Sequence, residues 1–142
     1  MTAYADASFL VSLYTLDANS AAAASQMTKL ARALFLTPFG ELELLNALAR
    51  RVFRGELSSK EVAAAEAALR EDIEKGLYVL QPCSLAVFEK AKETARKRTA
   101  HLGTRTLDVL HVASALVLQA ETYHSFDRNQ KKLARAEGLK TP

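Results

Sequence analysis

Four carboxylates stand at positions from which they could act together. Asp6 and Asp127 each follow a short apolar segment that has the character of a β-strand. Asp108 lies near the start of an almost entirely apolar helical segment, and Glu43 lies within another helical segment. Parallel α/β sheets bind ligands at the carboxyl ends of their strands, so the two strand-end aspartates could meet there with the two helical acids facing them.

Each acid also has a structural interpretation when it is taken alone. Asp6 and Asp127 could simply cap the helices that follow them. Asp108 lies in the first turn of its helix, where the helix dipole favours a negative charge. An acid in so apolar a helix nevertheless needs a partner, because an uncompensated buried charge is costly. Glu43 could be an ordinary solvated side chain. The joint placement of the four acids is what favours a functional site.

Carboxylates gathered in this way would need a cation. Two of them ~4 Å apart repel by roughly 4 kcal/mol at an effective dielectric constant near 20. Oxygen ligands without a set of cysteines or histidines favour a hard ion, and the sequence therefore predicts Mg²⁺ or Mn²⁺. Such an ion lowers the pKa of a bound water and stabilises charge on a phosphate. The chemistry indicated is hydrolysis of a phosphodiester or a phosphomonoester.

Polar and basic side chains accompany two of the acids. Asn46 and Arg50 follow Glu43 at i+3 and i+7, so the three share one stripe of a helix. Arg105 precedes Asp108 by three residues and, like Arg50, could bind a substrate phosphate; solvation at a helix entry is the alternative. His111 lies one turn after Asp108, and we expect it to be a core histidine that is hydrogen-bonded to a neighbour.

Length and composition describe an ordinary globular chain. It has 142 residues, 49% hydrophobic and 25% charged, and we expect one domain spanning residues 1–142. The net charge of +3 is too small to identify a nucleic-acid-binding protein by itself. The single Cys83 excludes an internal disulfide. The N-terminus has no basic leader, and no apolar run is long enough for a membrane span, so we expect a cytoplasmic protein.

Apolar segments alternate with helical patterns along the chain. This alternation predicts an α/β fold, a three-layer α/β/α sandwich with a short, mainly parallel central sheet. Strands are predicted at 3–5, 35–36, 78–80 and 122–126, with an edge strand at 139–140. Helices are predicted at 8–16, 20–34, 39–54, 58–75, 106–119 and 128–137, with one more after Ser84. The helix at 39–54 is predicted to bury Leu42, Leu45, Ala49 and Val52.

Four segments resemble the motif regions of a known family. YADASFL, LELLNAL, TLDVLHVASAL and SFDRNQKKLARAEGL occur in the order found in PIN domains, over nearly the whole chain. The set is most similar to the VapC-type toxins of toxin–antitoxin pairs. This resemblance implies the PIN-like fold and an Mg²⁺- or Mn²⁺-dependent ribonuclease. It also implies a homodimer and a cognate antitoxin that silences the enzyme.

The resemblance assigns roles to individual residues. It implies that the metal-binding, catalytic acids are Asp6, Glu43, Asp108 and Asp127. Ser8 matches a small hydroxyl residue after the first acid, and Ser125 stands where the family often has threonine. Either hydroxyl could orient a carboxylate, although a local backbone hydrogen bond is the simpler interpretation. Glu41 competes with Glu43 for its position, and the register of LELLNAL favours Glu43.

The mechanism predicted is in-line attack by a metal-activated water on an RNA phosphodiester. Asp6, Asp108 and Asp127 would hold one ion, and Glu43 would help directly or through water. Arg50 and Arg105 would hold the RNA backbone.

Three other interpretations stay open. The first is a metal-independent ribonuclease that uses His101, His111 or His124, which leaves the acids unexplained. The second is a response-regulator-like receiver. That class normally has adjacent acids after the first strand, whereas here Asp6 is followed by Ala7. The third is a non-catalytic module of the same fold that binds a metal, or a partner and its DNA operator.

Overall fold

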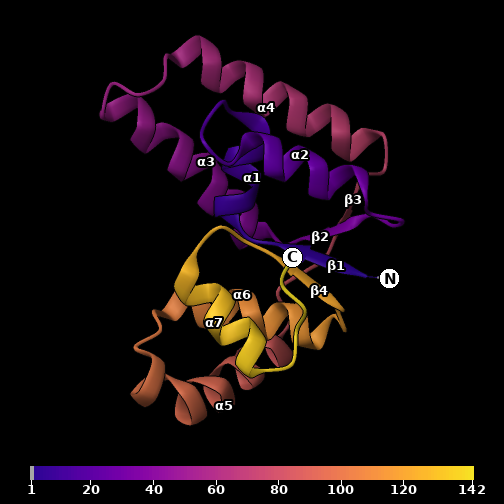
Figure 1. The fold of residues 1–142 in the computed structure, drawn as a ribbon, viewed down its shortest axis with the longest axis vertical. Helices are drawn as coiled ribbons and strands as arrows, with labels where there is room; N and C mark the ends of the chain where they lie inside the picture. The colour runs from indigo at the N-terminus through magenta and orange to yellow at the C-terminus, as the bar shows by residue number, and fades with distance from the viewer. Residues whose placement is uncertain (1) are drawn as a thin grey trace.

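A computed structural model describes residues 2–142 as a sheet of short strands enclosed by helices (Figure 1). The elements follow in the order β1 (Ala3–Ala5), α1 (Ala7–Tyr14), α2 (Ser20–Thr28), β2 (Leu34–Leu36), α3 (Pro38–Phe53), α4 (Ser59–Glu74), β3 (Tyr78–Leu80), α5 (Leu85–Leu102), α6 (Thr106–Val117), β4 (Thr122–His124) and α7 (Arg128–Ala136). Within the described part of the chain, no helix has both the length and the apolar character needed to cross a membrane.

The four strands form one sheet in the order β3-β2-β1-β4, and every pairing is parallel. Ala3 on β1 pairs with Leu34 on β2 and with Thr122 on β4. The carboxyl ends of β1 and β4 therefore lie side by side, which brings the segments after them together. The predicted α/β fold with a parallel sheet is confirmed.

Alternation along the strands divides the interior into two cores. Ala3 and Ala5 of β1 point into one core, while Tyr4 between them points into the other. The first core lies under α1–α4 and includes Phe9 and Leu10. The second lies under α5–α7 and includes Val112. Figure 1 shows these two groups of helices on opposite faces of the sheet, which gives the three layers.

Capping residues begin several helices where the sequence predicts them. Thr37 accepts a hydrogen bond from the Gly40 amide at the start of α3, with Pro38 at the first helical position. Ser58 and Glu61 form the predicted capping box of α4.

Several predicted boundaries were wrong. The alanine-rich helix ends at Thr28 rather than near Leu34, because Leu34 pairs with both Ala3 and Tyr78 in the sheet. Tertiary pairing thus overrides alanine's helical propensity. The strand predicted at 122–126 ends at His124, and the predicted edge strand is a single bridge between Lys140 and Thr122. Helices α1, α6 and α7 are one or two residues shorter at their C-termini than predicted.

The buried face of α3 also differs from the prediction. Leu44 and Leu48 are buried, whereas Leu42 is 66% exposed and Ala49 is exposed. Two helical stripes satisfy the same 3.6-residue spacing, and packing against α1 selects the one through Leu44. Glu43 borders this buried stripe, so its side chain lies at the edge of the core.

Candidate functional site

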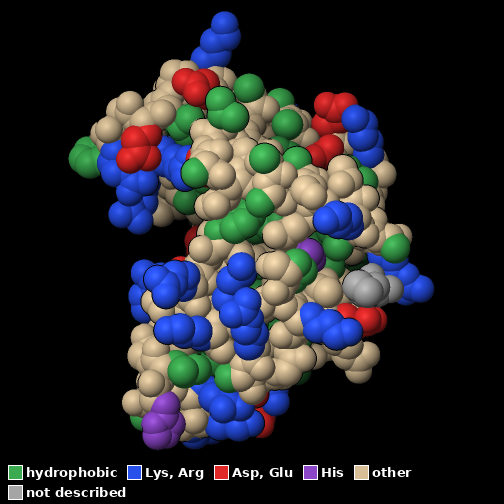
Figure 2. All heavy atoms as spheres, in the orientation of Figure 1, with side chains coloured by type: hydrophobic (Ala, Val, Ile, Leu, Met, Phe, Trp, Pro, Cys, Tyr) green, Lys and Arg blue, Asp and Glu red, His purple; other side chains and the backbone are tan. Residues whose placement is uncertain are grey.

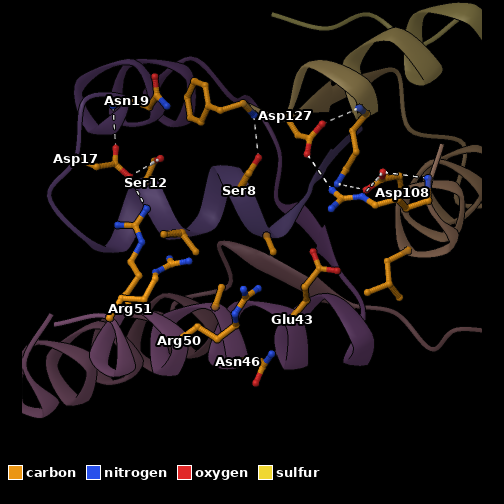
Figure 3. Close-up of a pocket in the computed structure, with 18 of the residues that line it drawn as sticks. Ser8, Ser12, Asp17, Asn19, Glu43, Asn46, Arg50, Arg51, Asp108 and Asp127 are labelled. Carbon is orange, nitrogen blue, oxygen red and sulfur yellow. Dashed lines mark hydrogen bonds and ion pairs between the residues drawn. The ribbon is translucent and has the colours of Figure 1, made fainter. Parts of the chain in front are cut away.

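A cleft of about 780 Å³ opens between α1 and α3 on one side and α6 and the start of α7 on the other. In Figure 2 the molecule is hollowed at its left edge, between its upper and lower halves, and Lys and Arg side chains flank the hollow. One end of the cleft is acidic and contains Glu43, Asp108 and Asp127. Figure 3 shows these three carboxylates facing the cleft from different elements.

Asp6 lies behind this cleft and caps α1. It is 0% exposed, and its two oxygens accept hydrogen bonds from Ser8 Oγ (2.7 Å) and Ser125 Oγ (2.6 Å). The Phe9 amide donates a further bond of 3.0 Å, as expected at an N-cap. Burial raises the pKa of Asp6, and the hydrogen bond from Ser125 opposes this rise most strongly.

The two serines join Asp6 to the cleft. Ser125 Oγ also accepts a bond from the Asp127 amide (2.9 Å), so one hydroxyl links two of the predicted acids. Ser8 Oγ accepts from the Phe126 amide (2.9 Å), and Ser8 itself lines the cleft. The sequence left open whether these hydroxyls bond to local backbone or orient a carboxylate. Ser125 does both, whereas Ser8 donates to Asp6 and accepts from a backbone amide far along the chain.

Asp108 and Asp127 are bridged by two residues, Arg105 and Gln130. Arg105 Nε lies 3.3 Å from Asp108 Oδ2, and Arg105 Nη2 lies 3.6 Å from Asp127 Oδ2. Gln130 donates through its side-chain amide to Asp108 (3.0 Å) and through its backbone amide to Asp127 (3.1 Å). Asp108 supplies the main charge that raises the pKa of Arg105. Asp127 also caps α7 through the Asn129 amide.

Glu43 approaches from α3 and contacts the opposite side of the site. Its Oε1 lies 3.2 Å from His111 Nε2, and His111 Nδ1 lies 2.7 Å from the Tyr4 hydroxyl. His111 is fully buried in the core. The sequence-based expectation of a core histidine hydrogen-bonded to a neighbour is therefore confirmed.

Each of the three cleft acids is held by hydrogen bonds or ion pairs to neighbouring side chains, and the acids do not yet surround a common point as metal ligands would. Among residues 2–142, no three His, Cys, Asp or Glu side chains are assembled closely enough to hold a metal ion together. The residues nevertheless fit a hard cation, because the acidic donors are all oxygen and a guanidinium already lies between two of them. The arrangement can bind positive charge at Asp108 and Asp127.

The other end of the cleft is basic. Arg50 and Arg51 of α3 line it together with Arg54, the residue that follows α3, and Asn46 lies between Arg50 and Glu43 (Figure 3). Arg51 contacts Asp17 at 3.5 Å, and Arg54 contacts Glu56 at 3.0 Å. A cleft with carboxylates at one end and guanidinium groups at the other can hold a polyanion across a cation site.

The sequence matches the family model of the PIN domain over residues 3–136. The chain belongs to the PIN domain family. The family predicted from the sequence motifs is thus confirmed. No curated protein sequence matches this PIN domain.

Solved structures share its fold. VapC20 from Mycobacterium tuberculosis, described as a sarcin–ricin loop cleaving toxin, is 18% identical with a TM-score of 0.73. The match covers 96% of this chain and 95% of that one. FitAcB from Neisseria gonorrhoeae is 15% identical with a TM-score of 0.67, over 98% of this chain and 95% of that one.

The histidines of this PIN domain do not form an acid–base pair at the cleft. None of the three described histidines is among its lining residues. His124 is buried and bonds to Gln26 and Thr122, and burial lowers its pKa to about 4. His101 is exposed at the end of α5. The geometry therefore favours the acids over the histidines as the groups that would take part in catalysis at the cleft.

Sequence reasoning missed two polar residues of the cleft. Gln130 is buried and bonds to both Asp108 and Asp127, and Asp17 holds the basic end through Arg51. Gln130 follows Asp127 by three residues, which is the position where a side chain can return to a helix start. That spacing was the available signal for Gln130; nothing local distinguishes Asp17 from an ordinary turn residue.

Proposed function

We propose that this PIN domain is an Mg²⁺- or Mn²⁺-dependent endoribonuclease, the toxin of a type II toxin–antitoxin pair. The observation that supports this most is the shared cleft, in which Glu43, Asp108 and Asp127 face one end and three arginines line the other. The fold similarity to VapC20, described as a sarcin–ricin loop cleaving toxin, points in the same direction.

Asp6, Asp108 and Asp127 would hold the cation, with Glu43 assisting directly or through water. When bound, the cation supplies a water of lowered pKa and neutralises charge that develops on the phosphate. Ser8 and Ser125 hold the Asp6 carboxylate in one orientation through bonds to both of its oxygens.

Basic residues of the chain would bind the RNA. Arg50 lines the cleft one turn from Asn46 and has no acidic partner within 4.0 Å among the described residues. Its guanidinium is therefore free to bind a backbone phosphate. Arg105 is 75% exposed and would contact the phosphate next to the cleaved bond once its own acids hold a cation.

The partners follow from the same proposal. A toxin of this kind acts in the cytoplasm as a homodimer and is silenced by a cognate antitoxin protein. Exposed apolar side chains could supply protein-binding surface, among them Leu16 (93% exposed), Phe53 (92%) and Leu85 (77%).

The test is cleavage of mixed cellular RNA by the purified protein with Mg²⁺, with Mn²⁺ and with EDTA. Asp108→Asn and Glu43→Gln should abolish or strongly reduce cleavage. Glu41→Gln is the matched control, because Glu41 lies on the same helix and outside the cleft. A 5′-phosphate on the downstream product is expected.

Other outcomes would redirect the proposal. Cleavage that survives EDTA and Asp108→Asn, with 2′,3′-cyclic phosphate products, would indicate histidine chemistry. Binding of Mn²⁺ or of a protein partner without any cleavage would indicate the non-catalytic module.

A further inference from the structure

Three polar side chains from three elements form a line of hydrogen bonds that ends at Glu43. Tyr4 on β1 places its hydroxyl 2.7 Å from His111 Nδ1, and His111 Nε2 lies 3.2 Å from Glu43 Oε1. Tyr4 is 1% exposed and His111 0%, whereas the Glu43 side chain is 27% exposed. The line therefore leads from the interior of the molecule to the acidic end of the cleft.

The chemistry of the two ends determines where the histidine proton lies. An ionised carboxylate only accepts hydrogen bonds, so the Glu43 contact requires a proton on His111 Nε2. A neutral imidazole then has a bare Nδ1, which must accept from a donor. The Tyr4 hydroxyl supplies that donor, because burial raises the pKa of Tyr4 and keeps the phenol protonated.

Packing holds the imidazole in this position. The Phe39 ring lies 4.6 Å from the His111 ring between centroids, and the Tyr4 ring meets it edge-on at 5.8 Å. Tyr4 is itself stacked on Tyr123, with ring planes 10° apart. A Cβ added at Gly40 would lie 3.6 Å from His111 Cε1, so the backbone of α3 also closes on the ring. Two aromatic rings and the backbone of α3 thus pack against the imidazole.

We propose that His111 is a positioning residue for Glu43. The Tyr4 hydroxyl holds His111 as the Nε2–H tautomer, and this N–H holds the Glu43 carboxylate toward the cation site. The inference rests on the proposed function, because it gives Glu43 a purpose in binding a divalent cation. Loss of an outer hydrogen-bond partner of a metal ligand typically weakens metal binding by about 10–100-fold.

The first test locates the proton without using activity. Two-bond ¹H–¹⁵N spectra of the full chain, labelled at histidine, distinguish protonated from bare ring nitrogens. We expect His111 to carry its proton on Nε2, with Nδ1 bare and hydrogen-bonded. In Tyr4→Phe the Nδ1 resonance should shift as its donor is lost, while His101 and His124 stay unchanged. A proton on Nδ1 of His111, alone or with one on Nε2, would overturn the proposal.

The second test measures Mn²⁺ affinity by calorimetry. His111→Leu removes the donor to Glu43 and should weaken binding by about 10–100-fold. His111→Gln is the matched variant, because its amide N–H can reach Glu43, and it should retain most of the affinity. Thermal unfolding of both variants checks that they fold. Equal Mn²⁺ affinity in the wild type and His111→Leu would contradict a positioning role.

The two tests separate this inference from the proposed function. A wild-type protein that binds no Mn²⁺ and cleaves no RNA would contradict the proposed function, and the spectra would still decide the His111 tautomer. Should His111→Leu fail to fold, Tyr4→Phe keeps the packed ring and removes only the hydroxyl. Its Mn²⁺ affinity should then fall, and an unchanged affinity together with an unchanged Nδ1 resonance would overturn the proposal.

Discussion

At the scale of single residues, the buried Asp6 carboxylate connects β1 to the segment after β4 through two serines. A charge without exposed surface persists in a protein interior only when its oxygens are hydrogen-bonded. Ser8 and Ser125 supply these bonds from segments far apart in the sequence. The same two hydroxyls accept bonds from the Phe126 and Asp127 amides, so they also fix the segment after β4.

Replacing Ser125 by alanine tests this arrangement. Ser125→Ala leaves one Asp6 oxygen without its donor and should lower the free energy of unfolding by about 1–3 kcal/mol. Ser114→Ala is the control, because Ser114 is equally buried but donates to the Leu110 carbonyl of its own helix and not to Asp6. Urea unfolding at pH 7 measures both. Equal losses in the two variants would show that Asp6 does not depend on this hydroxyl.

Arg105 occupies the position between Asp108 and Asp127 that a cation would share. A divalent ion therefore has to displace the guanidinium, and Arg105→Ala should bind Mn²⁺ more tightly in the absence of RNA. Because Arg105 is 75% exposed, its contacts are worth ~0.2–1 kcal/mol, which corresponds to roughly a 1.4–5-fold gain in affinity. Calorimetry measures it, with Arg32→Ala as a control for net charge. Weaker Mn²⁺ binding would instead assign Arg105 a role in holding the acids in place.

At the scale of elements, Asp17 joins three helices at the basic end of the cleft. It accepts from Ser12 of α1 (2.9 Å) and Ser20 of α2 (3.3 Å), and it contacts Arg51 of α3. Burial alone would raise the pKa of Asp17, but the Asn19 amide, Ser12 and Arg51 outweigh burial, and the pKa is lowered. The ionised carboxylate is thus the form that stabilises this corner.

The contribution of Asp17 to the free energy of unfolding should depend on pH. Because the folded pKa of Asp17 is lowered, its contribution is complete above the unfolded pKa of about 3.9 and is lost as the pH falls through the folded value. Asp17→Asn should cost about 1–3 kcal/mol at pH 7 and progressively less below pH 4. Urea unfolding across pH measures this, with Glu56→Gln as the exposed control. A cost that does not change with pH would contradict the role of the charge.

At the scale of the whole molecule, the distribution of charge matters more than the net charge of +3. The cleft has Glu43, Asp108 and Asp127 toward one end and the arginines of the α3 C-terminus toward the other. Arg32, by contrast, is not among the lining residues and precedes β2, at the amino ends of the parallel strands. Arginines in the groove that neutralise phosphates of a bound polyanion would release the counterions condensed on those phosphates, and Arg32 would release none.

RNA binding should therefore depend on salt in a position-specific way. In an Asp108→Asn background that prevents cleavage, Arg50→Ala should weaken binding of a labelled single-stranded RNA. It should also reduce the slope of log affinity against log salt by about 0.7. Arg32→Ala should leave the slope unchanged. Fluorescence anisotropy over a KCl series measures both variants, and equal slopes for them would place the RNA outside the groove.

The sequence by itself determined the α/β class, the PIN family and the caps of α3 and α4. These depend on residues close together in the chain, namely apolar periodicity, turn residues and local motifs. It also singled out Asp6, Glu43, Asp108 and Asp127, whose metal-binding role stays a prediction.

Only the tertiary structure decided how these residues meet. It selected the Leu44 stripe of α3 over the predicted Leu42 stripe, and it ended α2 early because Leu34 pairs in the sheet. It also placed Arg105 between two acids and His111 between Tyr4 and Glu43. The physical reason is that local spacing fits more than one face of a helix and does not determine which polar side chains pair with one another. Contacts between segments distant in the sequence determine both.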